Sequence, residues 1–400
     1  MASPLRILTF LHSFEPGGVE RVALRLVVAW RADGHEAHLV LGRQDGAMAA
    51  EWPGLEFEAL TQTGRYIRHI ETLWMILRLP REIRRIKPDI LFCSGNTYAV
   101  VAVAMKLWFG QRCPPIVAKI SNDLGRRDLP VLARSAYRIW LRLQGRLIDR
   151  FVGMASPMAD EIASAMHVPV PRVAIVNDPA VSIAQILPLA ASQTHSSIAR
   201  NGTRFVAIGR LVAQKNFGLM IRAFAAVAQA QDRLTIYGEG PERGALSRLV
   251  NALGMDTHIA LPGHINPVDG ALRVNDAFLL SSDYEGVPAV VVEALAHGLP
   301  VVATDCSISM ASLLDHGRLG MLVKVGSQTD FAQAMCEISS RSFSRSDAQA
   351  QARNFTVERA GRAYVAVFRS LANGHSDRPC EPKKVSDSAG VTLPEPRRLN

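Results

Sequence analysis

The chain has 400 residues, of which 48% are apolar, so it is long enough for two domains with separate hydrophobic cores. Lys and Arg outnumber Asp and Glu by 45 to 36, and this basic surplus favours anionic partners such as phosphates or acidic lipids. Basic and aromatic residues are not interleaved as in RNA-binding proteins, so nucleic acid is not an expected partner. The five cysteines form no C-x-x-C pair, which argues against a zinc site or a disulfide framework.

The N-terminal sequence runs from a short apolar stretch, residues 6–11, straight into a polar loop, which is not the pattern of a signal peptide. No apolar run approaches the length of a membrane-spanning helix. We therefore expect a cytoplasmic protein, with peripheral attachment to the inner face of the cell membrane as an open alternative.

The first half of the chain alternates apolar strands with amphipathic helices. RILTFL (6–11) predicts a buried strand, and VERVALRLVVAWRADG (19–34) predicts a helix that ends at Gly34. Further strands are expected within 35–42, 86–95, 114–121 and 150–156. Such alternation is typical of a parallel, doubly wound sheet.

The pattern stops after VNDPAV (176–181), where a polar, Ala- and Ser-rich stretch suggests a linker. A second series of strands follows within 203–210, 232–240, 257–263, 277–283 and 299–305. TVERAGRAYVAVFRSLA (356–372) predicts one more helix, and the proline- and charge-rich tail after it predicts disorder. The sequence therefore indicates two α/β domains in tandem.

Ligands of open α/β sheets bind at the carboxyl ends of the strands, so the residues just after each strand are the candidates for function. EPGGVE (15–20) follows the first strand and opens a helix, where Gly17 and Gly18 allow close approach of an anion to free N–H groups. It is neither a Walker loop nor G-x-G-x-x-G, and an ordinary tight turn explains it equally well.

GRLVAQKN (209–216) carries two cations at the end of one strand, Arg210 and Lys215. Two such charges are suited to a diphosphate, although solvated surface charge is the alternative. YGEGP (237–241) is a glycine-rich turn in which Gly238 and Gly240 let the backbone pass close to a ligand, as donor-binding candidates, and Pro241 suits a first helical turn. A purely structural turn explains these glycines at least equally well.

DYEGVPAVVVEALAHGLP (283–300) places Glu285 in a loop after a strand and Glu293 in the second turn of a helix whose predicted first residue is Pro288. Both carboxylates are positioned to accept hydrogen bonds from sugar or ribose hydroxyls. The structural alternatives are a favourable charge at a helix N-terminus for Glu285 and a partly buried, satisfied side chain for Glu293.

These motifs occur in the order GGVE, GRLVAQKNF, YGEGP and DYEGVPAVVVEALAHGLPVVATD. Together they resemble the family 4 retaining glycosyltransferases of the GT-B fold, such as those of bacterial polysaccharide and lipopolysaccharide synthesis. The resemblance extends over roughly residues 5–370 and is strongest in the second half. It implies an α/β protein whose two Rossmann-like, doubly wound domains face each other across a cleft.

In that family the C-terminal helix crosses back to the first domain. The expected organisation has five parts: an acceptor domain, a linker, a sugar-nucleotide domain, a crossing helix and a disordered tail, at 1–181, 182–202, 203–355, 356–374 and 375–400.

The resemblance implies transfer of a sugar, with retention of configuration, from a nucleotide-sugar donor to a glycan or lipid-linked acceptor of the cell envelope. A UDP-linked hexose or N-acetylhexosamine is favoured, and GDP-mannose stays open. Arg210 and Lys215 would hold the donor diphosphate as it leaves, so neither a metal ion nor a cofactor is expected. Glu285 would lie near the donor sugar, and Glu293 would bind the nucleotide ribose.

The backbone of Gly286, Val287 and Pro288 would meet the sugar and phosphates at a helix N-terminus. Gly17 and Gly18 would approach the donor phosphate or the acceptor from the first domain. All five are thus donor-site candidates on the strength of the resemblance.

The chain departs from the family pattern in two places. Many relatives carry a His where this chain reads VAKISNDLG (117–125), with Lys119, Asn122 and Asp123 instead; Asn122 and Asp123 are the weak candidates for a base. Ser312 stands where relatives often have a Glu.

A basic amphipathic segment, ARSAYRIWLRLQGRLIDR (133–150), lies in the first half of the chain, and a second basic segment occupies 76–87. The arginines of the segment 133–150 recur every four residues, at Arg134, Arg138, Arg142, Arg146 and Arg150. Such a helix can lie on an anionic membrane, and a solvated arginine face is the equal alternative.

Two other functions remain open from the sequence. A sugar-nucleotide epimerase shares the two-domain architecture, and a nucleotide-sugar-binding protein without catalysis would explain the missing His. An epimerase would need no added acceptor, and a binding protein would not hydrolyse the donor.

Overall fold

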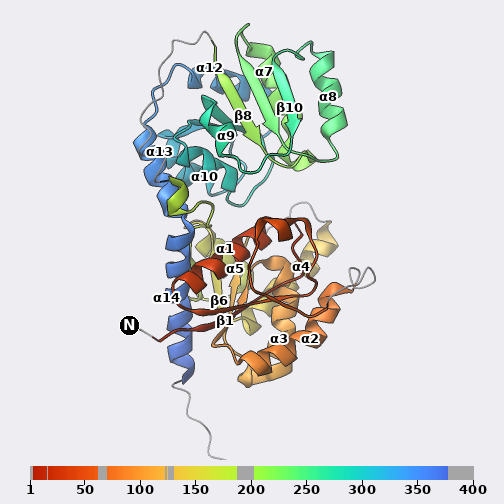
Figure 1. The fold of residues 1–400 in the computed structure, drawn as a ribbon, viewed down its shortest axis with the longest axis vertical. Coiled ribbons are helices and arrows are strands. Elements are labelled where there is room, and N and C mark those ends of the chain that lie inside the picture. Colours follow the sequence, from red (N-terminus) through yellow and green to blue (C-terminus); the bar gives the residue numbers. More distant parts are fainter. Residues whose placement is uncertain are drawn as a thin grey trace, which may run out of the picture.

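The computed structural model of the protein describes residues 3–15, 17–61, 70–121, 124, 130–186 and 202–376. These residues form two α/β domains, one above the other in Figure 1, each built on a parallel sheet. The strand order is β3-β2-β1-β4-β5-β6-β7 in the first sheet and β10-β9-β8-β11-β12-β13 in the second. In both, the chain winds outward from an interior first strand, which confirms the predicted doubly wound fold.

The first sheet consists of β1 (Arg6–Leu11), β2 (Glu36–Leu41), β3 (Glu58–Ala59), β4 (Ile90–Cys93), β5 (Ile116–Lys119), β6 (Arg150–Gly153) and β7 (Val173–Ile175). Its helices are α1 (Gly18–Ala32), α2 (Glu71–Ile86), α3 (Ala99–Phe109), α4 (Val131–Leu147) and α5 (Met158–Met166). Every residue of β4 and β5 is buried, as expected for parallel strands covered by helices on both faces.

The second sheet consists of β8 (Arg204–Ile208), β9 (Arg233–Tyr237), β10 (Ile259–Gly263), β11 (Ala277–Leu280), β12 (Val301–Thr304) and β13 (Gly320–Val323). Its helices are α7 (Phe217–Val227), α8 (Arg243–Ala252), α9 (Asp269–Arg273), α10 (Ala289–Ala296), α11 (Met310–Leu313), α12 (Gln328–Ile338) and α13 (Arg345–Ala352). The sequence analysis missed β13, because four residues directly after a turn show no periodicity.

Three predicted helix positions were wrong. Helix α10 begins at Ala289, and Pro288 precedes it with extended backbone, φ −73° and ψ 104°. Helix α8 begins at Arg243, two residues after Pro241. Arg150 belongs to strand β6 and not to the basic helix. The two prolines misled because a fixed φ near −65° suits both a first helical turn and the residue before it.

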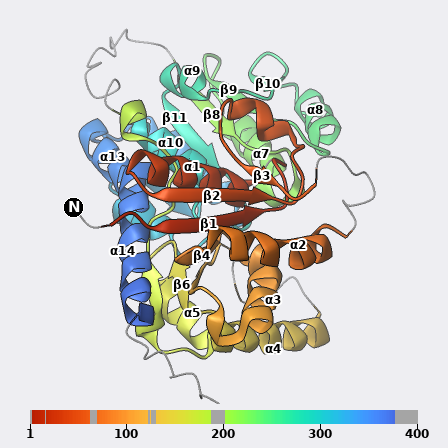
Figure 2. The same ribbon diagram turned by 60° about the horizontal axis from the view of Figure 1, so that its bottom comes forward.

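The last helix, α14 (Val357–Ser376), packs on the first domain, where Figure 2 shows it beside α1. Tyr364 and Phe368 of α14 belong to the first hydrophobic core. The indole Nε1 of Trp30 donates to the Gly361 carbonyl at 3.1 Å, and the rings of Trp30 and Phe368 lie 5.2 Å apart. Residues 187–201 of the predicted linker and 377–400 of the predicted tail lie outside the described residues, so the domain limits stay a prediction.

The carboxyl ends of the two sheets meet between the domains. A Cβ built on Gly286, which follows β11, would lie 2.7 Å from the carbonyl oxygen of Ser121, which follows β5. Val287 packs against both domain cores. The strand-end residues of both domains therefore face one another, as strand-end binding requires.

Candidate functional site

Two loops at the carboxyl ends of the neighbouring strands β8 and β11 are locked together. The Ser281 hydroxyl donates to the Lys215 carbonyl at 2.8 Å, and the Gln214 side-chain amide donates to the Tyr284 carbonyl at 2.7 Å. Because both loops are fixed in this way, the side chains that they carry are held in defined relative positions.

Lys215 and Glu285, which are 70 residues apart in sequence, form an ion pair at this strand end. The Lys215 Nζ lies 2.5 Å from Glu285 Oε1, which also accepts a hydrogen bond from Ser282 Oγ at 2.8 Å. Their side chains are only 18% and 13% exposed. Among the described residues Glu285 Oε2 has no hydrogen-bond partner, so it is open to a ligand hydroxyl.

Arg210, the second predicted cation, lies on the same loop and is exposed. Within the described part of the chain its guanidinium makes no hydrogen bond or ion pair. Arg210 therefore keeps its full donor capacity for an anion, whereas Lys215 is already neutralised by Glu285.

Two predicted glycines are required by the packing of these loops. Gly238 has φ +150°, and a Cβ there would lie 1.8 Å from the Gly209 carbonyl oxygen. Gly240 has φ +158°, and its Cβ would lie 2.3 Å from the Leu211 carbonyl oxygen. Only glycine lets the turn after β9 lie directly on the loop that carries Arg210 and Lys215.

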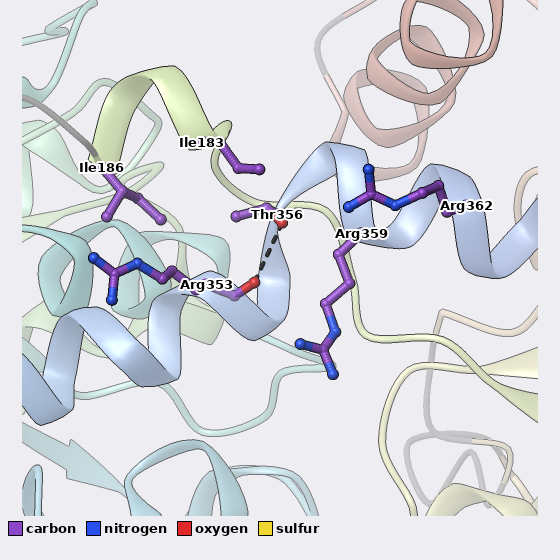
Figure 3. A pocket seen from close by; sticks show the side chains of 6 residues that line it. All are labelled: Ile183, Ile186, Arg353, Thr356, Arg359 and Arg362. Carbon is purple, nitrogen blue, oxygen red and sulfur yellow. Dashed lines mark hydrogen bonds between the residues drawn. The ribbon is translucent and has the colours of Figure 1, made fainter. Parts of the chain in front are cut away.

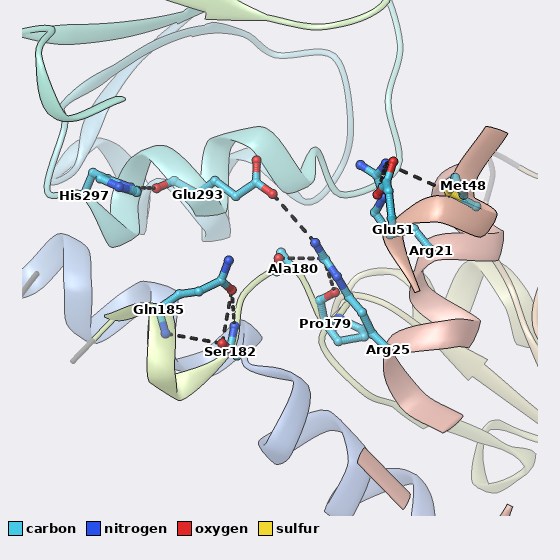
Figure 4. A network of polar contacts seen from close by, with 10 residues as sticks. All are labelled: Arg21, Arg25, Met48, Glu51, Pro179, Ala180, Ser182, Gln185, Glu293 and His297. Atoms are coloured by element: carbon cyan, nitrogen blue, oxygen red, sulfur yellow. Dashed lines mark hydrogen bonds and ion pairs between the residues drawn. The ribbon is translucent and has the colours of Figure 1, made fainter. Parts of the chain in front are cut away.

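Glu293 has a different partner from Glu285. Its Oε1 is 3.9 Å from Nη2 of Arg25 on α1, so this ion pair joins the two domains (Figure 4). Burial raises the pKa of Glu293 to about 7, while Arg25 and, more weakly, Arg21 oppose that rise. Near neutral pH this carboxyl group is poised between its protonated and ionised forms.

The other predicted residues of the first domain are less close to these groups. Gly17 is the N-cap of α1, where a Cβ would clash with Glu20 Oε2 at 1.9 Å, and Gly18 faces open space. Asn122 and Asp123 lie outside the described residues. Lys119 is buried and pairs with Asp178 Oδ1 at 2.5 Å, which indicates a structural role.

The sequence analysis missed a polar cluster after β1, made by His12, Glu20 and Tyr98. The Tyr98 hydroxyl donates to Glu20 Oε1 at 2.7 Å and accepts from the His12 backbone N–H at 3.4 Å. The His12 ring packs on Tyr98 with centroids 4.8 Å apart, and burial lowers the pKa of His12. His12 directly follows a predicted strand, so its position was the signal that could have found it.

Arg43, just after β2, extends this polar region. Its Nη1 pairs with Asp45 at 2.6 Å and its Nε with Glu71 at 2.8 Å, although only 7% of the Arg43 side chain is exposed. The strand-end surface of the first domain thus contains charges that are already satisfied within that domain.

A separate cavity of about 420 Å³ lies where α14 begins, lined by Ile183, Ile186, Arg353, Thr356, Arg359 and Arg362. Its three guanidinium groups point in different directions in Figure 3 and do not converge on one ligand position. The strand-end groups remain the candidate site.

Both halves of the protein match known sequence families. Residues 16–178 match the model described as Glycosyltransferase Family 4, and residues 202–341 match the model described as Glycosyl transferases group 1. The chain belongs to the family 4 glycosyltransferases. The first of these ranges contains strands β2 to β7 and the second contains β8 to β13, so the family assignment rests on both domains.

Relatives of this glycosyltransferase include the lipopolysaccharide core glycosyltransferase LpsE of Rhizobium meliloti, 31% identical over 33% of this chain and 38% of that protein. Another is the Campylobacter jejuni N-acetylgalactosamine-N,N'-diacetylbacillosaminyl-diphospho-undecaprenol 4-alpha-N-acetylgalactosaminyltransferase, 30% identical over 32% of this chain and 35% of that protein. The matches span about a third of the length of the curated relatives.

The fold is similar to that of Anabaena HepE, solved in complex with UDP. The TM-score is 0.74 at 18% identity, over 92% of this chain and 100% of that one. The glycosyltransferase therefore has the GT-B fold.

Proposed function

We propose that the protein transfers a sugar, with retention of configuration, from a nucleotide-sugar donor to a glycan or lipid-linked acceptor in envelope polysaccharide synthesis. The observation that carries this proposal is the Lys215–Glu285 pair at the ends of β8 and β11, beside the unpaired Arg210. A cation pair and a carboxylate with a free oxygen match the diphosphate and the hydroxyls of such a donor.

In the proposed reaction the bond from the sugar C1 to the diphosphate oxygen breaks, and a bond from C1 to the acceptor oxygen forms on the same face. The acceptor proton passes to the leaving phosphate. Lys215 and Arg210 stabilise the charge that develops on the diphosphate, which is the largest contribution expected from the protein. Glu285 Oε2 accepts a hydrogen bond from a hydroxyl of the transferred sugar and so orients the sugar.

The names of the relatives support the wider assignment. LpsE is named for lipopolysaccharide core synthesis, and the Campylobacter enzyme is named for a diphospho-undecaprenol acceptor. HepE was solved with UDP, which favours a UDP-sugar over GDP-mannose here. We therefore propose a UDP-hexose or UDP-N-acetylhexosamine donor.

The test is donor turnover with UDP-glucose, UDP-galactose, UDP-N-acetylglucosamine, UDP-N-acetylgalactosamine and GDP-mannose. One of these should be hydrolysed slowly to the free nucleotide and an α-configured sugar, as seen by NMR at early times. Release of a β-configured sugar would exclude retention. Conversion of the donor to its epimer, without nucleotide release, would identify an epimerase instead.

We also propose that the first domain docks on an anionic membrane through α4 and its neighbours. Arg138, Arg142 and Arg146 of α4 are exposed. Large apolar side chains are exposed on α4 and on the adjacent α2 and α3, namely Val131, Leu132, Ile139, Leu73, Leu77, Leu107 and Trp108. Figure 2 shows α2, α3 and α4 grouped at one side of the first domain. Exposed apolar groups beside arginines match the boundary of an anionic bilayer.

None of the described helices is both long and apolar enough to cross a bilayer, so binding would be at the surface. Co-sedimentation with vesicles of phosphatidylglycerol and phosphatidylcholine should deplete the protein from solution, and pure phosphatidylcholine should not. Replacing Arg138, Arg142 and Arg146 together by Glu should abolish sedimentation. Equal sedimentation of this variant would overturn the docking surface.

A further inference from the structure

Arg25 of α1 lies where the two domains and the chain between them meet. Its Nη1 donates to the carbonyl oxygens of Pro179 and Ala180, at 3.1 and 2.6 Å. Its Nη2 lies 3.9 Å from Glu293 Oε1 of the second domain, as Figure 4 shows. The side chains of Arg25 and Glu293 are 20% and 17% exposed, so water screens this pair only weakly.

The carbonyls that Arg25 binds belong to the connection between the domains. The Ala180 N–H donates to the Phe355 carbonyl at 2.9 Å, and Val181 forms a parallel bridge with Thr356. The chain passes between the domains twice, and residues 180–181 of the first passage are hydrogen-bonded to residues 355–357 of the second. Arg25 binds the first passage to α1. A single guanidinium thus contacts both the segment in which the chain leaves the first domain and a carboxylate of the second domain.

The charges around Glu293 come from several elements. Arg25 and Arg21 on α1 favour its ionised form, and Asp269 on α9 disfavours it. On α10 itself the His297 ring nitrogen Nδ1 lies 2.9 Å from the Glu293 carbonyl oxygen. Burial and, to a smaller extent, the positive charge of Arg345 on α13 lower the pKa of that ring. Arg25 is the strongest of the groups that favour the anion, because Arg21 is engaged by Glu51 at 3.3 Å.

We propose that Arg25 is a positioning residue for donor binding, which fixes the place and charge of the Glu293 carboxylate and ties it to the connection between the domains. This inference rests on the proposed function, and within it on the role that the family resemblance implies for Glu293, which is to receive the ribose hydroxyls. The anion accepts hydrogen bonds on both oxygens, whereas protonation turns one oxygen into a donor and weakens acceptance from the ribose hydroxyls. With Oε1 held towards Arg25, Oε2 stays available to the nucleotide, and occupancy of the ribose site is coupled to the placement of the domains.

The test is calorimetric titration of the full chain with UDP and with GDP between pH 6 and pH 9. In the wild type, affinity should fall as the pH drops through about 7, where Glu293 becomes protonated. Arg25→Met removes the charge that favours the anion, so its midpoint should move up by about one pH unit. At pH 7 the variant should bind about fivefold more weakly, and at pH 9 it should recover. Arg21→Met, one turn earlier on α1, is the matched control and should shift the midpoint much less.

Arg25→Lys separates charge from packing, since it keeps the cation and loses the paired carbonyl contacts. Its pH midpoint should stay near that of the wild type, and a midpoint equal to that of Arg25→Met would overturn the inference. Arg25→Met in a Glu293→Gln background should cause no further loss. If Glu293→Gln binds nucleotide as the wild type does, the ribose role in the proposed function is wrong. If Glu293→Gln weakens binding but Arg25→Met keeps the wild-type pH profile, only the Arg25 inference fails.

Discussion

The strand-end surfaces of the two domains differ in whether their polar and charged groups have partners within the domain. The donor face, meaning Arg210, Lys215 and Glu285, keeps an unpaired guanidinium and a free carboxylate oxygen among the described residues. The first-domain face, meaning His12 and Tyr98 with their hydrogen-bond partners, has its polar groups satisfied internally. We propose from this difference that charge recognition belongs to the second domain, and that the first domain offers its ligand a preformed surface whose polar groups are already hydrogen-bonded.

Removing Lys215, one of the two cations of the donor face, should have the largest effect. Lys215→Ala deletes a charge that stabilises the leaving diphosphate, so turnover should fall by about 100- to 1,000-fold. Arg248→Ala, at an exposed arginine of α8, is the control and should retain full turnover. Steady-state rates of nucleotide release measure both. Wild-type turnover in Lys215→Ala would refute the site assignment.

The second effect concerns the backbone that supports the donor face. Gly238→Ala places a methyl group against the Gly209 carbonyl at a φ of +150°, so it should destabilise the second domain by about 4 kcal/mol. Gly270→Ala on α9, where the added Cβ meets open space, should leave stability nearly unchanged. Urea unfolding of the three proteins tests this, and equal midpoints would show that the loop can move aside.

The third effect should separate stability from binding at Glu293. Its pKa is raised to about 7 in the folded protein, so the folded state keeps a proton that the unfolded state releases near pH 4.5. Stability is therefore lost as the pH rises through this window, and the full cost is present above pH 7. Glu293→Gln should be more stable than the wild type at pH 8, by up to about 3 kcal/mol, and similar at pH 5.

Thermal unfolding at these two pH values measures the effect. Glu337→Gln, at a half-buried carboxylate of α12 that pairs with Arg341, serves as the control and should not be more stable than the wild type at pH 8. A Glu293→Gln variant that is less stable than the wild type at pH 8 would contradict the account of its burial.

The smallest effect is expected on the first-domain face. Tyr98→Phe removes the hydroxyl that bridges Glu20 and the His12 backbone, so stability should fall by about 1.5 kcal/mol. Nucleotide affinity should not change, because charge recognition lies in the other domain. A loss of nucleotide affinity in Tyr98→Phe would break the division between the two faces.

The two domains differ in how much of this the sequence predicts. The donor face follows from local signals, since Lys215 and Glu285 each come just after a strand and the glycines mark close backbone approach. That Lys215 and Glu285 form a pair depends on β8 and β11 being neighbours, which is a property of the sheet order. The doubly wound pattern predicts such an order but not which side chains meet.

The interdomain contacts could not be predicted in the same way. Arg25 shows the periodicity of an ordinary helix residue, and nothing near it in sequence indicates Glu293, which is 268 positions away by number. The Arg25–Glu293 contact is set by how two finished domains dock, and one sequence carries no local signal for that. The pairing of Lys119 with Asp178 lies within the first domain and depends on where the chain leaves it.

The most direct test of the central claim, that the Lys215–Glu285 face binds the donor nucleotide, is titration of UDP and of GDP into wild type, Lys215→Ala and Arg248→Ala. One nucleotide should bind the wild type and Arg248→Ala equally, and Lys215→Ala should lose at least about tenfold in affinity, as expected for a charge-assisted phosphate contact. Equal affinity in all three proteins would contradict it.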